Sequence, residues 1–227
     1  MLEGFHTLKH AIRFGAQLKL VVGMSLSELA DISEEYGPDI ASVLESQVTL
    51  VPHEVFRQLA PVPPPTGVIG IAKRPAASLT EMLGDQIQAP IVLLENPRNM
   101  LNIGAAIRVS AAAGSAGVIT TGNQDPWHPA AIIASAGLHY ALNVVRAQAL
   151  PYSDRPLLVI DPTGDPLQPG SIPANSILAF GAERKGITQE LLAAADQRVS
   201  IPMCQGVSSL NLATAVAVVL YSWKLGK

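Results

Sequence analysis

The chain has 227 residues, of which 48% are hydrophobic and 15% charged, and its formal net charge is −3. This composition supplies ample apolar material for a buried core and excludes an intrinsically disordered chain. No apolar run approaches the roughly 18 residues that a membrane helix needs, and the N-terminus lacks the apolar centre of a secretory signal. We therefore expect a cytoplasmic protein without a membrane partner.

The charges are unevenly distributed along the chain. Residues 1–88 carry 6 Lys and Arg against 10 Asp and Glu, whereas residues 89–227 carry 9 against 8. Because nucleic-acid binding normally depends on neutralising phosphates, any basic surface must be local. Cys204 is the single cysteine, which excludes an internal disulfide, and we expect its side chain to be buried. The five histidines show no recurring ligand spacing, so we expect no metal site.

The first part of the chain has the pattern of a small α/β domain. Apolar residues recur at helical spacing over residues 5–14, 28–45 and 53–60, and short apolar strands are expected over residues 18–23, 48–51 and 66–72. Serial prolines and small polar residues between Pro61 and Gly84 are typical of a connector. We place the first domain at residues 1–75, a linker at 76–88 and a second domain at 89–227.

The second domain alternates apolar strands with helices. Strands are expected over residues 91–95, 117–120, 142–145, 157–161, 177–181 and 198–202, and helices over residues 102–113, 129–135, 188–195 and 209–223. Gly114 is placed to cap the first of these helices, and Ser208-Ser209 to cap the last, with Asn211 in its first turn. Fully apolar strands between helices predict a mostly parallel sheet covered on both faces.

Three segments place polar residues where a strand leads into a helix. Open α/β sheets bind their ligands at this carboxyl edge of the strands. They are ENPRNMLNIGAAIRVSAAAG (95–114), ILAFGAERKGIT (177–188) and RVSIPMCQGVSSLNLATAVAVVLYSW (198–223). Each segment also has an ordinary structural explanation. In the first, Arg108 lies on a solvated face or pairs with Glu95; the second is a tight charged turn; and the third is a capped core helix. The second segment matches neither a phosphate-binding loop nor a dinucleotide fingerprint, which disfavours a nucleotide-binding oxidoreductase.

In this order, NIGAAIR, LAFGAERKG and IPMCQGVSSLNLATAVA resemble the three motifs of the SpoU-type (TrmH-like) branch of the SPOUT RNA methyltransferases. The resemblance implies an α/β domain with a deep trefoil knot, which is an exception to the rule that chains do not thread loops. It implies a homodimer with the active site near the two-fold interface. It also implies S-adenosylmethionine as cofactor and an RNA ribose 2′-hydroxyl as methyl acceptor.

The site residues are carried over by position. The resemblance implies that Gly181, Ile201 and Leu210 contact the cofactor mainly through backbone groups, and that Met203, Ser209 and Asn211 complete the pocket. It implies that Arg108 is catalytic, with Asn102 nearby and Glu183 as its partner. Ala213 departs from the serine of many relatives. Since arginine stays protonated, we expect Arg108 to stabilise developing negative charge rather than act as a base.

The N-terminal region resembles a small ribosomal-protein-like RNA-binding module in EGFHTLKHAIRFGA and PPPTGVIGIA. The candidate RNA contacts there are Lys9, Arg13, Lys73 and Arg74, which are equally well explained as solvated charges. The two-domain layout favours ribosomal RNA over transfer RNA by family analogy. Trp127-His128-Pro129 either lines the substrate cleft or packs on its own domain. The alternative function is an inactive RNA-binding or scaffolding protein built on the same knotted domain.

Overall fold

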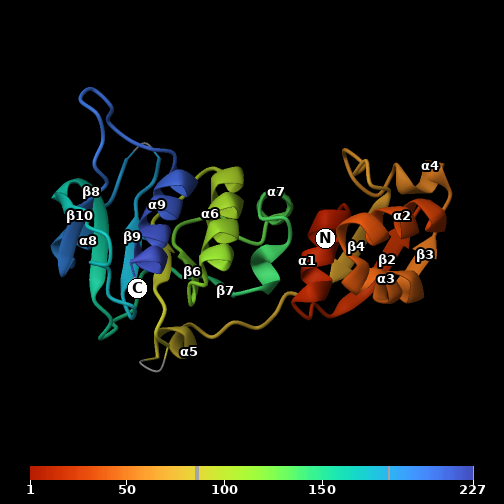
Figure 1. The fold of residues 1–227 in the computed structure, drawn as a ribbon, viewed down its shortest axis with the longest axis horizontal. Coiled ribbons are helices and arrows are strands. Elements are labelled where there is room, and N and C mark those ends of the chain that lie inside the picture. The colour runs from red at the N-terminus through yellow and green to blue at the C-terminus, as the bar shows by residue number, and fades with distance from the viewer. Residues whose placement is uncertain (85–86, 184, 227) are drawn as a thin grey trace.

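A computed structural model of the protein describes residues 1–84, 87–183 and 185–226. Residues 85 and 86 of the predicted linker, and Arg184 of the second motif, lie outside the described residues. The chain forms a four-stranded sheet followed by a six-stranded sheet, and Figure 1 shows them at opposite ends of an elongated molecule. The α/β class predicted from the sequence is confirmed.

The first sheet is mixed and has the strand order β1-β4-β2-β3. Its strands are β1 (Leu2–Glu3), β2 (Leu18–Gly23), β3 (Val48–Leu50) and β4 (Val68–Ala72). The helices around it are α1 (Phe5–Arg13), α2 (Leu26–Tyr36), the 3₁₀ turn η1 (Pro38–Ile40), α3 (Ala41–Gln47) and α4 (His53–Phe56). The helical segment expected at residues 28–45 is broken at Gly37-Pro38, because proline cannot continue the backbone hydrogen bonding of a helix. Strand β1 is an element that the sequence analysis missed.

The second sheet is parallel throughout and has the strand order β10-β8-β9-β5-β6-β7. Its strands are β5 (Ile91–Leu94), β6 (Gly117–Thr120), β7 (Asn143–Arg146), β8 (Leu157–Pro166), β9 (Ile177–Phe180) and β10 (Gln197–Ser200). All four residues of β5, β6 and β9 are buried, in agreement with strands covered on both faces. Strand β8 is longer than the predicted 157–161.

Helices cover both faces of this sheet. Helices α6 (Met100–Ala113) and α9 (Leu212–Leu225) pack side by side on one face, with α7 (Pro129–Ala134) and η2 (Leu138–Tyr140) beyond them (Figure 1). The opposite face carries the short helices α5 (Leu79–Leu83), within the predicted linker, and α8 (Gln189–Ala193). Gly104 permits the close contact of α6 with α7, because a Cβ there would lie 2.2 Å from the Ala131 carbonyl oxygen.

The starts of α6 and α9 correct the predicted boundaries. Helix α6 begins two residues early, at Met100, because the Asn99 side chain accepts from the backbone N–H groups of Leu101 and Asn102. Helix α9 begins late: Asn211, not the serines, is its N-cap and accepts from the Ala213 N–H at 2.9 Å. Residues 201–210 are therefore irregular backbone. Cys204 lies in this loop and is exposed, so its predicted burial is wrong.

The two sheets are joined through α1, which packs on η2. His10 Nδ1 lies 2.7 Å from the Ala136 carbonyl oxygen, and a Cβ at Gly137 would lie 2.2 Å from the Thr7 carbonyl oxygen. One continuous cluster of buried apolar side chains includes Phe5 and Leu8 of α1 as well as Ile132 of α7. The relative position of the sheets is therefore set by close packing, as within a single core.

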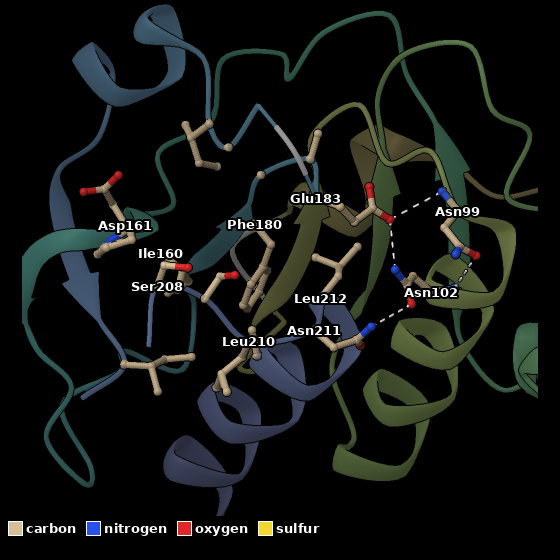
Figure 2. Close-up of a pocket in the computed structure, with 18 of the residues that line it drawn as sticks. Asn99, Asn102, Ile160, Asp161, Phe180, Glu183, Ser208, Leu210, Asn211 and Leu212 are labelled. Atoms are coloured by element: carbon tan, nitrogen blue, oxygen red, sulfur yellow. Dashed lines mark hydrogen bonds between the residues drawn. The ribbon is translucent and has the colours of Figure 1, made fainter. Parts of the chain in front are cut away.

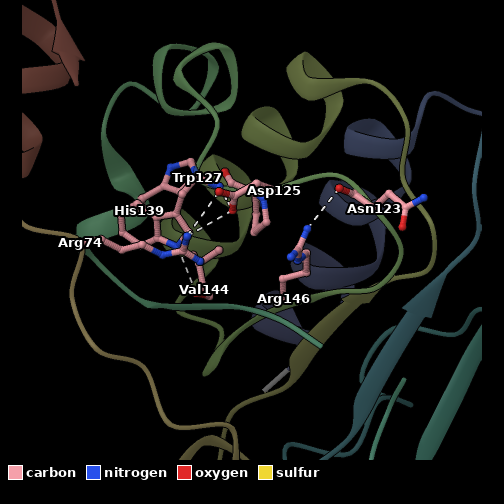
Figure 3. A network of polar contacts seen from close by, with 8 residues as sticks. Arg74, Asn123, Asp125, Trp127, His139, Val144 and Arg146 are labelled. Atoms are coloured by element: carbon pink, nitrogen blue, oxygen red, sulfur yellow. Dashed lines mark hydrogen bonds and ion pairs between the residues drawn. The ribbon is translucent and has the colours of Figure 1, made fainter. Parts of the chain in front are cut away.

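A second contact fixes the segment that connects the sheets. Arg74 pairs with Asp125 at 3.3 Å and stacks 5.2 Å from the centre of the Trp127 ring (Figure 3). Trp127 is buried and donates from its indole N–H to the Val144 carbonyl at 3.2 Å, so it packs within its own part of the fold. Of the four basic residues proposed as RNA contacts, Lys9, Arg13 and Arg74 thus bond within the protein, to Tyr36, Asp39 and Asp125.

His139 lies beneath this contact and is fully buried. Its Nε2 donates to the Pro126 carbonyl at 2.7 Å, and its Nδ1 faces the Ser135 hydroxyl at 2.7 Å. Burial lowers the pKa of His139 from 6.5 to about 4, with a further lowering by Arg74. The imidazole is therefore neutral in the folded protein at pH 7.

His139 makes folding stability depend on pH. Because its folded pKa is lower than its unfolded pKa, its stabilising effect is complete above pH 6.5 and is lost as the pH falls towards 4. We expect the free energy of unfolding to drop by about 3 kcal/mol more over this range in the wild type than in His139→Gln. Denaturant titrations at several pH values measure this difference, with His53→Gln at an exposed position as the matched control. Parallel pH profiles of wild type and His139→Gln would contradict the assignment.

Candidate functional site

A cavity of about 1020 Å³ lies where the middle of β8, just past its pairing with β9, and the carboxyl end of β9 meet the first turns of α6 and α9. Figure 2 shows side chains from these elements converging on it. Its wall comes from four stretches: the loop after β5 with the start of α6, the middle of β8, the end of β9 with the loop after it, and the loop before α9 with the start of that helix. The residues are Arg98, Asn99, Asn102, Ile160, Asp161, Pro162, Phe180, Gly181, Ala182, Glu183, Gly186, Ile187, Ile201, Met203, Ser208, Ser209, Leu210, Asn211, Leu212 and Ala215. The carboxyl edge of a parallel sheet is where such folds bind their ligands.

A chain of hydrogen bonds links the three polar segments at the mouth of this cavity (Figure 2). Asn211 Nδ2 donates to Asn102 Oδ1 at 3.0 Å, and Asn102 Nδ2 donates to Glu183 Oε1 at 3.0 Å. Glu183 also accepts from the backbone N–H groups of Arg98 and Asn99, at 3.3 and 3.4 Å. Residues more than 80 positions apart in sequence are thus held in one arrangement.

The environment of Glu183 keeps its carboxyl ionised. Partial burial raises its pKa, but the hydrogen bonds from Asn102 and from the backbone N–H groups of Arg98 and Asn99 outweigh it, so that the pKa lies below its ordinary value of 4.5. A carboxylate that accepts several N–H groups is stabilised in its charged form. Glu183 is therefore an acceptor that fixes two loops, and it is poorly suited to take up a proton at neutral pH.

The loop after β9 makes an unusually close approach to its own backbone. A Cβ at Gly181 would lie 2.2 Å from the Gly186 carbonyl carbon and 2.4 Å from the Ile187 nitrogen, so only glycine fits there. Ala182 and Gly186 exchange backbone hydrogen bonds across the turn. At its end, the Thr188 N–H and hydroxyl donate to the carboxylate of Glu95 at 2.8 and 2.7 Å. Glu95 is thus occupied and does not pair with Arg108.

Most of the residues singled out in the sequence meet at this cavity. Its wall includes Gly181, Ile201, Met203, Ser209, Leu210 and Asn211, which were assigned to the cofactor, as well as Asn102 and Glu183. Arg108 does not line it and is exposed on α6. Six residues after Asn102, Arg108 is turned by about 240° and displaced by about 9 Å along the helix, so the two side chains point to different sides.

Two charged residues of the cavity wall were not selected from the sequence. Arg98 follows β5 and Asp161 lies within β8, and both line the cavity. Asp161 Oδ1 accepts from the Thr163 N–H at 2.9 Å, which leaves its other oxygen available. The available signal was their position in the sequence, where Arg98 follows one expected strand and Asp161 ends another, since polar residues that follow apolar strands lie at the binding edge of a parallel sheet.

Comparisons with known proteins agree with this geometry. Residues 89–221 match the SpoU rRNA Methylase family. The chain is 28% identical over 236 residues to the 23S rRNA (adenosine(1067)-2′-O)-methyltransferase of Streptomyces laurentii, covering 97% of this chain and 84% of that protein. It is 24% identical to the 23S rRNA (uridine(2479)-2′-O)-methyltransferase of Streptomyces viridochromogenes, covering 97% and 80%.

Among solved structures, the SpoU methyltransferase AviRb of Streptomyces viridochromogenes in complex with AdoMet superposes with a TM-score of 0.76 at 22% identity. This superposition covers 98% of the chain and 88% of AviRb, so the likeness of fold extends over both sheets. The parallel sheet and its edge cavity define a ligand-binding α/β protein. The matched residues assign it further: the chain belongs to the SpoU rRNA methylase family.

Glu183→Gln tests the hydrogen-bond chain. The amide keeps the size of the side chain but loses the charge that holds the N–H groups of Arg98 and Asn99. We expect the melting temperature at pH 7 to fall by about 2 to 4 °C, the shift that about 1 kcal/mol causes in a chain of this length. Because the folded pKa is lowered, this difference persists above pH 4.5 and disappears as the pH falls below it.

Calorimetric melting curves between pH 3.5 and about pH 8 follow this dependence, with Glu45→Gln at an exposed position of α3 as control. A melting temperature of Glu183→Gln that matches the wild type at neutral pH would show that the charge of Glu183 does not hold the loops.

Proposed function

We propose that this protein is an S-adenosylmethionine-dependent RNA methyltransferase that transfers a methyl group to a ribose 2′-hydroxyl. The observation that carries this proposal is the hydrogen-bond chain Asn211–Asn102–Glu183, which brings all three motifs to the mouth of one cavity. Ribosomal RNA is the favoured substrate, because relatives that align with 97% of the chain are named 23S rRNA 2′-O-methyltransferases. Transfer RNA is the other candidate.

The cavity fits the proposed cofactor. Its volume of about 1020 Å³ is at the upper end of the range of small-molecule sites, about 300 to 1000 Å³, and leaves room for a nucleotide beside the cofactor. Phe180, Ile201 and Leu210 supply apolar wall for an adenine ring, and the missing side chain of Gly181 lets a ligand approach the backbone. Asp161 and Asn211 supply polar groups for the ribose and the amino-acid end.

The bound cofactor would supply an already activated methyl group on a sulfonium sulfur. The protein has then to hold the acceptor oxygen in line with that methyl group and to exclude competing water, so positioning contributes most of the rate. Asn102 and Glu183 fix the two loops at the cavity mouth where the acceptor would enter. The hydroxyl proton leaves late, to water, because neither the ionised Glu183 nor a permanently charged arginine is a suitable base.

Arg108 would act across an interface between two copies of the chain. Helices α6 and α9 pack on the same sheet face, so their outer sides point away from the sheet together. On α9, Val218, Tyr221 and Leu225 recur at helical spacing and stay exposed, Leu225 by 79%. On α6, Arg108 shares the outer side with Leu101, which is 59% exposed. An apolar surface of this kind is typical of a protein interface, and we propose a two-fold homodimer through it.

Three further properties complete the proposal. The residues at 89–227 form the methyltransferase domain with a deep trefoil knot, and residues 1–75 form a domain that binds the RNA substrate, with residues 76–88 as the linker between them.

Within the described ranges, no helix is long and apolar enough to cross a membrane. We place the protein in the cytoplasm because the named relatives are bacterial, and bacteria assemble their ribosomes there.

A catalytically inactive scaffold on the same fold is less well supported. A protein that no longer bound the cofactor would not need Asn102, Glu183 and Asn211 in mutual hydrogen bonds, or an open cavity beside them. Ala213, where many relatives carry serine, faces partly inward on α9 and leaves these bonds intact.

The first test is calorimetric titration with S-adenosylmethionine and S-adenosylhomocysteine. We expect binding in the micromolar range for the wild type and affinity about tenfold lower in Asn211→Ser, because loss of one hydrogen bond near a ligand costs about 1 to 1.5 kcal/mol. Serine can still cap α9, so this variant separates the pocket contact from helix stability. Asn143→Ala on β7 is the matched control. A folded wild type that binds neither compound would refute the enzyme and favour the scaffold.

Mixed dimers test the position of Arg108. Arg108→Ala and Asn102→Ala should each abolish methyl transfer to unmodified 23S rRNA transcripts. If Arg108 serves the site of the other copy, each mixed dimer has one intact site, and random mixing restores about a quarter of wild-type activity in a two-fold dimer. If Arg108 serves its own chain, no mixed dimer has an intact site and activity stays absent. Transfer of tritiated methyl groups after co-refolding measures the recovery, with each variant refolded alone as control.

A further inference from the structure

A second cavity, of about 460 Å³, adjoins the first on the other side of the loop after β9. Arg98, Ala182 and Gly186 line both cavities, so this loop and Arg98 form the wall between them. The first cavity lies beside the middle of β8 and the carboxyl end of β9, and the second at the carboxyl ends of β5 and β6, the next strands along the same sheet. A ligand in the second cavity would therefore lie beside one in the first.

The second cavity is cationic. Arg98 and Lys185 line it, and Arg146 lies at its margin, where it donates to the Asn123 carbonyl at 3.1 Å (Figure 3). Within the part of the chain that the structure describes, neither Arg98 nor Lys185 forms an ion pair. A pair of cations without carboxylate partners favours an anionic ligand.

Three carboxylates of the described residues, Glu183, Glu95 and Asp125, lie beside this cavity. Glu183 accepts from two backbone N–H groups and from Asn102, and Glu95 accepts from Thr188. Asp125 pairs with Arg74 and accepts from the Trp127 N–H. Of these three, only Asp125 has its charge balanced by a cation. Glu183 and Glu95 remain as two carboxylates beside the three cations Arg98, Lys185 and Arg146, so these side chains leave the cavity with a net positive charge.

Amide side chains add hydrogen-bond donors to the same cavity. Asn96, Asn123 and Gln124 line it, and Asn96 is held in the left-handed region at a φ of 48°. Such a backbone is unusual outside glycine and persists where the surroundings fix it. Here the Asn96 N–H donates to the Thr121 hydroxyl at 3.0 Å, and only glycine at 122 leaves room for the Asn96 side chain.

We propose that this second cavity binds the RNA phosphate next to the target ribose, with Lys185 and Arg98 as the charged contacts and the amides as further donors. This inference rests on the proposed function and deepens it. Cofactor and acceptor would occupy adjoining cavities on one sheet edge, and the loop between them would lie beside the reacting atoms. Phosphate contacts position RNA without reading its sequence, so this site sets register rather than base preference.

The test combines filter binding of unmodified 23S and 16S rRNA transcripts, over a range of salt concentrations, with titration of S-adenosylhomocysteine. For Lys185→Gln and Arg98→Gln we expect RNA affinity lower by about three- to tenfold for both transcripts, and a salt slope smaller by about 0.7 to 0.9 for each lost contact. For Lys185→Gln the affinity for S-adenosylhomocysteine should be unchanged. Arg198→Gln is the matched control, since this arginine is on β10 and donates to Leu192.

Each failure has its own signature. The phosphate site would be overturned if Lys185→Gln and Arg98→Gln had the same RNA affinity and salt slope as Arg198→Gln. It would also be overturned if Lys185→Gln lost affinity for S-adenosylhomocysteine, because the cation would then belong to the cofactor carboxylate. A wild type that binds RNA with a slope dependent on Lys185, yet binds no S-adenosylmethionine, would support the phosphate site and overturn the proposed function. A wild type that binds no RNA would overturn both.

Discussion

The carboxylate of Glu183 accepts hydrogen bonds from two backbone N–H groups at the start of α6 and from Asn102, which in turn accepts from Asn211. This chain of bonds holds three loops that enter the site from three different strands. Its effect depends on the parallel sheet, because parallel strands place all their carboxyl ends at one edge. The tight turn at Gly181 then brings Glu183 to that edge.

The two helices that carry the site are held in place mainly by apolar packing. Helices α6 and α9 share a core with the sheet that includes Ile103, Ile107, Val216 and Leu220, all fully buried. Asn211 contacts Asn102 at one end of the two helices, and Lys224 donates to the carbonyl oxygens of Ala112 and Ala113 at the other. A polar site held on packed helices keeps its geometry better than one held on loops alone.

The first sheet is placed as a rigid extension of the second, yet its outer helix α2 presents an acidic surface with Glu28, Asp31, Glu34 and Glu35 exposed. Such a surface repels phosphates, and three of the four basic residues expected to contact RNA are bonded within the protein. The unpaired cations of the described chain near the site, Arg98 and Lys185, lie instead at the carboxyl edge of the second sheet. We infer that the reacting part of the RNA approaches along this edge, and that residues 1–75 contact RNA through a surface other than α2.

The sequence by itself determined the fold class and most element boundaries, and it singled out eight residues of the cavity wall, because apolar periodicity and motif residues are local signals. It failed in the loop before α9: Asn211, and not the serines, caps the helix through the Ala213 N–H, and Cys204 in the irregular loop is exposed. Only the tertiary structure joined Asn102, Glu183 and Asn211, separated Arg108 from them, and brought Arg98 and Lys185 together, since helix rotation and strand order decide which side chains meet.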